Sequence, residues 1–390
     1  MGVCAAAFAP LRGADWPHWR GPEANGVSRE TGWTYQWPAG GPKQLWKARV
    51  GTGFSSFAVA QGRVYTMGNA NDTDTVFCFD AATGRELWKH SYPCPLDAKY
   101  YEGGTSATPT VDGERVYTLS KRGEVFCLDA ARGTVIWSKK LADELGAKVP
   151  TWGFASSAYV AGNLILFNLG GAGTALDKQD GKVVWTNGKE EAGYSTPVPF
   201  QAEGQPAVAL FTKQHVVAVR VSDGQELWRY PWKTSYDINA ADPIVSGDQV
   251  FISSGYNHGA ALLRVSGNKV EKVWENKAMR NHFNSCVLWQ EHLYGVDESE
   301  LRCLTWAGGE VKWTDRAFGK GSLIVADGKL LGLSERGELI VAETTPAAFK
   351  PLARAQVLGG KCWTTPVLAN GRVYCRNAAG DVVCLDVTGK

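Results

Sequence analysis

The chain has 390 residues, 44% of them apolar and 21% charged, so it can bury a large core and does not have the composition of a disordered protein. Its 41 Lys and Arg residues against 39 Asp and Glu leave a formal charge of +2, without a basic run dense enough to neutralise a row of phosphates. Nucleic acid is therefore not expected as a partner. The sequence contains no apolar stretch of about 18 residues, so no membrane-spanning helix is predicted.

The first 14 residues are predicted to be a leader. The stretch "MGVCAAAFAPLRGADW" has a short Ala-rich segment and small residues suited to cleavage, but it lacks the basic start of a secretory signal. It is either a truncated signal peptide or a disordered cytosolic N-terminus. We favour export, partly on the resemblance given below, and expect a periplasmic or otherwise exported protein. Residues 15–41 would form an extended lead-in to one domain over residues 42–390.

A repeat carrying one tryptophan per unit runs through the rest of the chain. The tryptophans lie 39 to 49 residues apart, a period typical of four-stranded propeller blades, at Trp46, Trp88, Trp137, Trp185, Trp228, Trp274 and Trp313. Within each unit, runs of alternating apolar and polar residues are separated by short Gly-containing turns, which predicts antiparallel hairpins. Only residues 141–149 look helical.

Eight units can be counted from the predicted starts of their first strands, near Ser55, Ser106, Ser156, Ser195, Ala240, Asn284, Ser322 and Thr364. The seventh lacks the tryptophan of its last strand, where Phe349 is expected to substitute. The eighth ends at residue 390 without a fourth strand, whereas residues 42–50, around Trp46, form a fourth strand with no strands before it. Pairing these two fragments closes a ring and removes its open edges. We therefore predict an all-β, eight-bladed β-propeller of four-stranded antiparallel blades, expected to be a monomer.

The repeat also explains many aromatic and thiol side chains without a functional role. The repeated tryptophans are expected to be packing anchors between blades, and Cys78, Cys127, Cys303 and Cys384 share one position in the third strand, where a small buried residue is needed. Four further cysteines stand outside this register, and their disulfide pairing stays open: Cys94, Cys286, Cys362 and Cys375. There is no C-x-x-C pair, so neither a thiolate zinc site nor covalent haem is supported.

The repeat words resemble those of the pyrroloquinoline quinone (PQQ) propeller family. They include "VFCFDAATGRELW", "VFCLDAARGTVIW", "TALDKQDGKVVW" and "VVCLDVTGK", and the likeness extends from about residue 43 to the C-terminus. The resemblance implies one of two kinds of protein. Quinoprotein alcohol dehydrogenases hold PQQ and calcium at the centre and use an Asp base, whereas other members keep the ring without a cofactor and bind proteins. This chain lacks the adjacent cysteine pair of the dehydrogenases and is shorter than they are.

A ligand site is expected around the central channel, on the face that carries the loops from the fourth strand of one blade to the first strand of the next. We call it the loop face. Its loops vary from unit to unit while the strand words stay alike, which leaves their residues free for binding. The candidates for holding a cofactor or a planar, anionic or sugar-like ligand are Trp152, Tyr194, Tyr236, Asn239, His258, Arg280, His282, Asn284, Lys320, Lys361 and Trp363.

Several of these candidates have an alternative interpretation. Asp242 precedes a proline where other units have Thr. It is a general base or, with Asp237, Asn239 and Asn284, an oxygen ligand of calcium, or else it accepts backbone hydrogen bonds at a strand start, which we favour. His258 and His282 either converge on one ligand or are solvated loop residues, which is the commoner case. Singly, each cationic candidate is more often a surface charge.

Two main functions remain. The first is an exported binding scaffold that takes a small molecule, a glycan or a protein at its loop face, and it explains the missing cysteine pair and modest length. The second is a PQQ- and calcium-dependent alcohol or sugar dehydrogenase with a reduced site, stacking the quinone on Trp152 or Trp363 and using Asp242 as the base. We prefer binding to catalysis. A hydrolase using the carboxylates of this face has no supporting motif.

Overall fold

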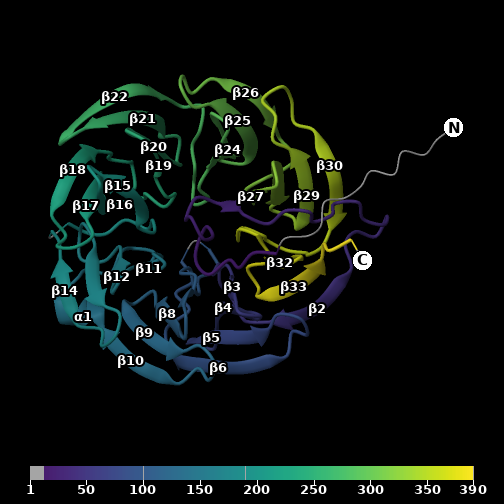
Figure 1. The fold of residues 1–390 in the computed structure, drawn as a ribbon, viewed down its shortest axis with the longest axis horizontal. Coiled ribbons are helices and arrows are strands. Elements are labelled where there is room, and N and C mark those ends of the chain that lie inside the picture. The colour runs from purple at the N-terminus through teal and green to yellow at the C-terminus, as the bar shows by residue number, and fades with distance from the viewer. Residues whose placement is uncertain (1–12, 100, 189, 390) are drawn as a thin grey trace.

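Eight β-sheets are arranged around a central axis in the computed structural model, which describes residues 13–99, 101–188 and 190–389 (Figure 1). Each blade has four antiparallel strands, with the first strand innermost and the fourth at the rim. The strands follow chain order in every blade except the last, whose fourth strand comes from the N-terminal region. The predicted eight-bladed β-propeller is therefore confirmed. Of the predicted leader, residues 1–12 lie outside the described part of the chain.

The first four blades are formed by β3 (Ala58–Ala60), β4 (Arg63–Ala70), β5 (Thr73–Asp80) and β6 (Glu86–Pro93); β7 (Thr110–Asp112), β8 (Arg115–Leu119), β9 (Glu124–Asp129) and β10 (Val135–Lys140); β11 (Tyr159–Ala161), β12 (Leu164–Phe167), β13 (Thr174–Asp177) and β14 (Val183–Thr186); and β15 (Val198–Ala202), β16 (Gln205–Phe211), β17 (His215–Arg220) and β18 (Glu226–Pro231). The last four are formed by β19 (Ile244–Ser246), β20 (Gln249–Ser254), β21 (Gly259–Ser266) and β22 (Lys269–Asn276); β23 (Val287–Trp289), β24 (His292–Asp297), β25 (Glu300–Thr305) and β26 (Val311–Asp315); β27 (Ser322–Ala326), β28 (Lys329–Leu333), β29 (Glu338–Glu343) and β30 (Pro351–Gln356); and β31 (Val367–Ala369), β32 (Arg372–Arg376), β33 (Asp381–Asp386) and β2 (Gln44–Arg49).

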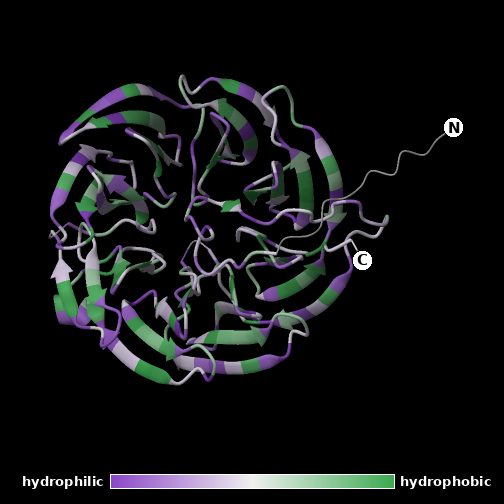
Figure 2. Cartoon of the chain, in the orientation of Figure 1, coloured by the Kyte–Doolittle hydropathy of each residue, from purple (hydrophilic) through white to green (hydrophobic). Residues whose placement is uncertain are grey.

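The ring closes as predicted, because β2 pairs antiparallel with β33 and places Trp46 opposite Cys384. N-terminal and C-terminal strands thus share one blade, as the purple β2 beside the yellow β33 shows (Figure 1). The outer strands alternate hydrophilic and hydrophobic residues, since one face of each blade packs on its neighbour (Figure 2). The helix α1 (Leu141–Leu145) is shorter than predicted and ends at Gly146, in the left-handed conformation. No segment of the described chain is a helix long and apolar enough to cross a membrane.

Six of the seven repeated tryptophans link their blade to the next one through an indole hydrogen bond. The Trp88 indole N–H donates to the carbonyl of Ala130 in the following blade (2.9 Å), and Gly133 in the same turn packs against the ring. Equivalent bonds are made by Trp46, Trp137, Trp185, Trp274 and Trp313. The repeated cysteines lie directly opposite these tryptophans, as Cys78 does Trp88, and are fully buried. Both expectations are confirmed.

The expectation about Phe349 is corrected. Phe349 does not substitute for a tryptophan, because it lies before β30 and packs on Trp313 of the preceding blade (5.4 Å between ring centroids). The tryptophan position of β30 is occupied by Ala353, which pairs with Val341 of β29 as Trp313 pairs with Cys303. The four cysteines outside the register are buried and unpaired in the described structure: Cys94, Cys286, Cys362 and Cys375.

The lead-in, residues 15–41, packs against the propeller and crosses the middle of the ring (Figure 1). Trp16 bridges to Val59 near the end of β3, and β1 (Val27–Ser28) adds a parallel fifth strand to β27. The Glu30 carboxylate then accepts the backbone N–H groups of Asn370 (2.6 Å) and Gly371 in the turn after β31. These contacts lie at the ends of innermost strands, so the lead-in occupies the side of the ring opposite the loop face.

Candidate functional site

A chain of hydrogen bonds runs around the channel where the innermost strands begin. The backbone N–H of one blade donates to a side-chain oxygen of the next blade at the equivalent position, with distances of 2.8 to 3.1 Å, from Ser56 to Thr108, Ser157, Thr196, Asp242 and Ser285. Five members of this hoop carry a hydroxyl and one carries a carboxylate. The hoop fixes the spacing of the six loops above these blades, because each of its five bonds joins two neighbouring blades.

Above the hoop, the loop face encloses a cavity of about 370 Å³ on the channel axis. Every loop that enters an innermost strand contributes to its lining, and so does the lead-in through Trp19. The lining residues are Trp19, Phe54, Tyr101, Ser106, Trp152, Ala155, Ser157, Tyr194, Thr196, Ile238, Ala240, Asp242, Tyr256, His282, Phe283, Asn284, Lys320, Trp363, Thr364 and Thr365. The size lies within the range of small-molecule sites.

Aromatic rings in mutual contact make most of the wall. Neighbouring ring centroids lie 4.3 to 5.9 Å apart along the series Trp152, Tyr101, Phe54, Trp363, Phe283, His282 and Tyr256. Offset and edge contacts of this kind stabilise aromatic pairs beyond the burial of their surface. Burial raises the pKa of the Tyr101 phenol to about 12, so its hydroxyl stays protonated. The aromatic rings thus form an apolar, uncharged section of the wall.

Asp242 lies at the bottom of the cavity and holds the lead-in there. One carboxylate oxygen accepts the backbone N–H of Thr196 (2.8 Å), and the other accepts the Trp19 indole N–H (2.6 Å) and the Ser285 hydroxyl (3.3 Å). The Arg20 guanidinium lies 3.9 Å from the second oxygen, and both charged side chains are almost fully buried. The lead-in therefore closes the far end of the channel, and Trp19 forms part of the cavity floor.

These contacts match the alternative interpretation of Asp242 as an acceptor of backbone hydrogen bonds. Burial raises the pKa of its carboxyl, and the Arg20 charge opposes that rise. A general base needs an oxygen free to take a proton from a substrate. Both Asp242 oxygens are already engaged by protein donors, so the geometry does not support the catalytic role.

Lys320 and His282 form the polar part of the wall. The loop before β27 carries Lys320, and the loop before β23 carries His282, so two neighbouring blades bring them together. The Lys320 ammonium lies 3.0 Å from His282 Nδ1 and 5.8 Å from the centroid of the Trp363 ring. An ammonium group can only donate, so His282 accepts at Nδ1 and carries its proton on Nε2. Burial, followed by the Lys320 charge, lowers the pKa of His282 and favours this neutral form.

Of the predicted site residues, seven line the cavity together: Trp152, Tyr194, Asp242, His282, Asn284, Lys320 and Trp363. Asn284 donates to the carbonyl of Gly321 (2.6 Å) and so fixes the loop that carries Lys320. Lys361 does not line the cavity, but lies 4.3 Å from the Trp363 ring centroid and pairs with Glu102 at 2.6 Å.

Five other candidates lie outside the cavity. Tyr236 is 67% exposed and packs edge-on against Tyr256. Asn239 is fully buried and bonds the carbonyls of Lys213 and Trp232. The His258 ring packs against the Trp232 ring, with 4.5 Å between centroids. The Asp237 carboxylate contacts Lys213 and Gln214. Arg280 pairs with Asp297.

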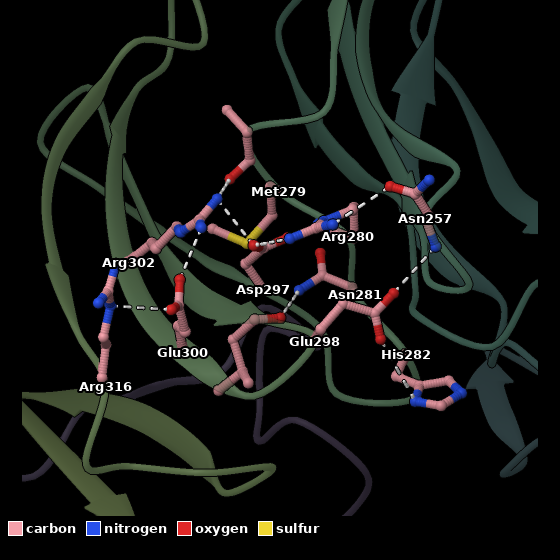
Figure 3. Close-up of polar contacts among 12 residues, drawn as sticks. Asn257, Met279, Arg280, Asn281, His282, Asp297, Glu298, Glu300, Arg302 and Arg316 are labelled. Carbon is pink, nitrogen blue, oxygen red and sulfur yellow. Dashed lines mark hydrogen bonds and ion pairs between the residues drawn. The ribbon is translucent and has the colours of Figure 1, made fainter.

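Arg280 belongs to an ion-pair network that fixes the loop bearing His282 (Figure 3). Its guanidinium binds the buried Asp297 carboxylate through two bonds of 2.7 and 2.6 Å, and Arg302 binds the same carboxylate at 2.7 Å. Glu298 accepts the backbone N–H of Asn257 and lies 3.9 Å from His282 Nδ1. Of the two interpretations given for His258 and His282, convergence on one ligand is not seen, because only His282 lines the cavity.

The described residues do not fit the calcium and PQQ pair of the dehydrogenases. Calcium takes about six to eight oxygen ligands. The cavity lining holds one carboxylate, that of Asp242, and Asp237 lies outside it. In the part of the chain that the structure describes, no three or more His, Cys, Asp or Glu side chains are grouped to hold a metal ion.

Sequence reasoning missed Trp19, Phe54 and Phe283 as lining residues. Trp19 belongs to the lead-in, which has no counterpart in the repeat and therefore no register from which a position can be inferred. Phe54 and Phe283 stand just before the predicted strand starts at Ser55 and Asn284, the position that the candidates Tyr194 and Trp363 hold in two other units. That shared position was a readable signal.

The comparisons with known proteins concern the fold. The family model described as outer membrane protein assembly factor BamB matches residues 28–98 and 73–315. No curated protein matches the chain. The BamB structure from Moraxella catarrhalis is 13% identical with a TM-score of 0.63, covering 88% of this chain and 97% of that chain. The quinohemoprotein alcohol dehydrogenase of Comamonas testosteroni is 14% identical with a TM-score of 0.68, covering 99% and 82%.

A computationally designed protein, Ika8, has the same fold, with 11% identity, a TM-score of 0.65 and coverage of 88% of this chain and 100% of that chain. These low identities show a shared fold and leave function to the site. The family match covers more than half of the sequence, from residue 28 to residue 315. This chain therefore belongs to the PQQ-repeat propeller family whose model is described as outer membrane protein assembly factor BamB.

Proposed function

We propose that this protein is an exported binding scaffold that holds a small molecule in the axial cavity of its loop face. One observation carries the proposal: six of the eight unlike loops bring aromatic side chains to one cavity, while the hydrogen-bond hoop beneath them repeats over six blades. The repeated blade structure by itself requires only equivalent turns, so unlike residues at equivalent loop positions serve another purpose. The description of the family as an assembly factor fits a binding role.

Binding of a neutral aromatic probe tests this proposal. Trp363 and Phe54 stack on each other in the cavity lining (5.7 Å between centroids), so 2-naphthalenemethanol should bind saturably beside them in isothermal titration calorimetry. Trp363→Ala should weaken the affinity about tenfold, equivalent to roughly 1.4 kcal/mol. Tyr236→Ala, which removes an exposed aromatic outside the cavity, should leave the affinity unchanged. Absence of saturable binding to the wild-type protein would overturn the proposal.

The alternative function, a quinoprotein-type dehydrogenase, has no specific observation in its favour, because the Asp242 oxygens are engaged and calcium ligands are not assembled. We expect PQQ and calcium to give no alcohol-dependent reduction of a dye by the purified protein. Turnover that disappeared in a folded Asp242→Asn variant would instead support the dehydrogenase.

A further inference from the structure

We infer that the ligand of the axial cavity is an organic anion: an aromatic or similarly flat apolar group that carries a carboxylate or comparable negative charge, bound by Lys320. This inference rests on the proposed function, since it specifies the ligand of the same cavity. It begins from the balance of charges around the lining.

Three positively charged side chains lie near the cavity, those of Arg20, Lys361 and Lys320, and the first two are already paired with a carboxylate. The Asp242 carboxylate at the floor faces the Arg20 guanidinium at 3.9 Å, and both are buried together. At the rim, the Lys361 ammonium contacts the Glu102 carboxylate at 2.6 Å. Each positive charge therefore has its own counter-charge, and neither is available to a ligand without breaking an existing pair.

Lys320 differs, because its ammonium has no carboxylate within 4.0 Å anywhere in the described chain. The nearby Glu335 carboxylate accepts the indole N–H of Trp363 (2.9 Å) and the backbone N–H of Lys320 (3.2 Å) instead. Glu298 faces His282 rather than Lys320. A half-buried ammonium beside aromatic walls loses hydration, and an anion within contact distance would offset that loss.

The neighbour of the Lys320 ammonium is a neutral base and not an acid. His282 accepts one ammonium N–H at 3.0 Å, which fixes the position of the charge over the cavity and uses one of three donors. Two N–H bonds remain for an acceptor on a ligand. The network of Arg280 and Asp297 holds the His282 loop in place, so the charge is presented from a fixed position (Figure 3).

The apolar part of the ligand is set by the rings beside Lys320. Trp363 lies 5.8 Å from the ammonium, and Phe283 and Phe54 adjoin Trp363 with centroids at 4.6 and 5.7 Å. A flat group lying on these rings would place an attached carboxylate next to the ammonium. The wall supplies dispersion and burial, and the lysine supplies the selection for charge.

A pair of probes that differ only in charge tests the inference. Titration calorimetry of the wild-type protein with 2-naphthoate and with neutral 2-naphthalenemethanol should give at least tenfold tighter binding of the anion. Lys320→Gln should abolish this preference and leave the affinity for the alcohol unchanged. Lys312→Gln removes an exposed lysine from β26 of the preceding blade and should behave like the wild type.

The outcomes separate the two proposals. If the wild-type protein binds both probes equally, or if Lys320→Gln keeps the preference, the inference about charge is wrong and the binding scaffold stands. If neither probe binds, the proposed function itself fails. A measurement without the variant guards against misfolding: in the wild type, naphthoate should shift the imidazole ¹⁵N resonances of His282, which contacts Lys320, more than the alcohol does. Equal shifts would also contradict the inference.

Discussion

Asp242 occupies a hoop position at which the neighbouring blades carry a hydroxyl, and its second oxygen gives the lead-in an attachment point. Asp242→Thr restores the residue type found at Thr108 and Thr196 but leaves Arg20 buried without its counter-charge. Loss of one partner of a buried ion pair costs about 3–5 kcal/mol. We expect the free energy of unfolding, measured by urea denaturation, to fall by that amount.

The matched control is Thr108→Ser, which keeps a hydroxyl at the equivalent position of another blade and should change the free energy of unfolding by less than about 1 kcal/mol. An Asp242→Thr variant as stable as the wild type would show that the contacts of Trp19 and Arg20 do not hold the lead-in.

His282 gives the stability of the protein a dependence on pH. Burial lowers its pKa in the folded state from the ordinary value of 6.5, so below that pH the unfolded chain binds a proton that the folded protein does not. The stabilising contribution is complete above pH 6.5 and is lost as the pH falls towards the lowered pKa. Between about pH 7.5 and 5.5, the urea midpoint should fall more for the wild type than for His282→Gln.

The other histidines with lowered pKa values, His18, His90 and His258, are present in both proteins, so their effect cancels in this comparison. Identical pH profiles for the two proteins would mean that His282 is not desolvated as its contacts indicate.

Among the elements, the turns between third and fourth strands depend on glycine for two separable reasons. Gly224 has φ +72°, and a Cβ there would lie 2.5 Å from the Trp185 ring of the preceding blade. Gly247, in the turn between the first and second strands β19 and β20, has a similar φ of +59° but nothing within 4 Å. Gly224→Ala should therefore destabilise the protein by about 1–3 kcal/mol more than Gly247→Ala, since only the first also overpacks a contact.

Thermal and urea denaturation of the two variants measure this difference. If both substitutions cost the same free energy, backbone strain alone explains the glycines, and the close contact with tryptophan is unimportant.

At the scale of the whole molecule, one strand from the N-terminal region completes the last blade. Deleting residues 1–49 removes β2 and leaves β33 with an unpaired edge. Exposed edges recruit strands from other chains, so we expect the truncated protein to form oligomers or aggregates in size-exclusion chromatography with light scattering. Deleting residues 1–12 keeps β2 beside β33 and should leave the chromatographic profile unchanged. A monodisperse monomer lacking residues 1–49 would contradict the role of β2 in closing the ring.

The sequence predicted the ring well because each blade repeats the same packing problem, so eight units report one answer. It failed where one unit departs from the rest: Phe349 has the right character but lies in the wrong turn, and Ala353 takes the tryptophan position. The site was only partly predictable. Lys320 meets His282, and Trp19 meets Asp242, through the curvature of the ring and the course of the lead-in, which no local pattern encodes.

The hydrogen-bond hoop has a sense of rotation, since from Ser56 to Ser285 every amide points to the following blade and none points back. An inner blade of this series cannot tilt outward alone without breaking the bonds to both of its neighbours. Widening of the central channel along these blades is therefore disfavoured. A ligand reaches the axial cavity by passing between the loops of the loop face.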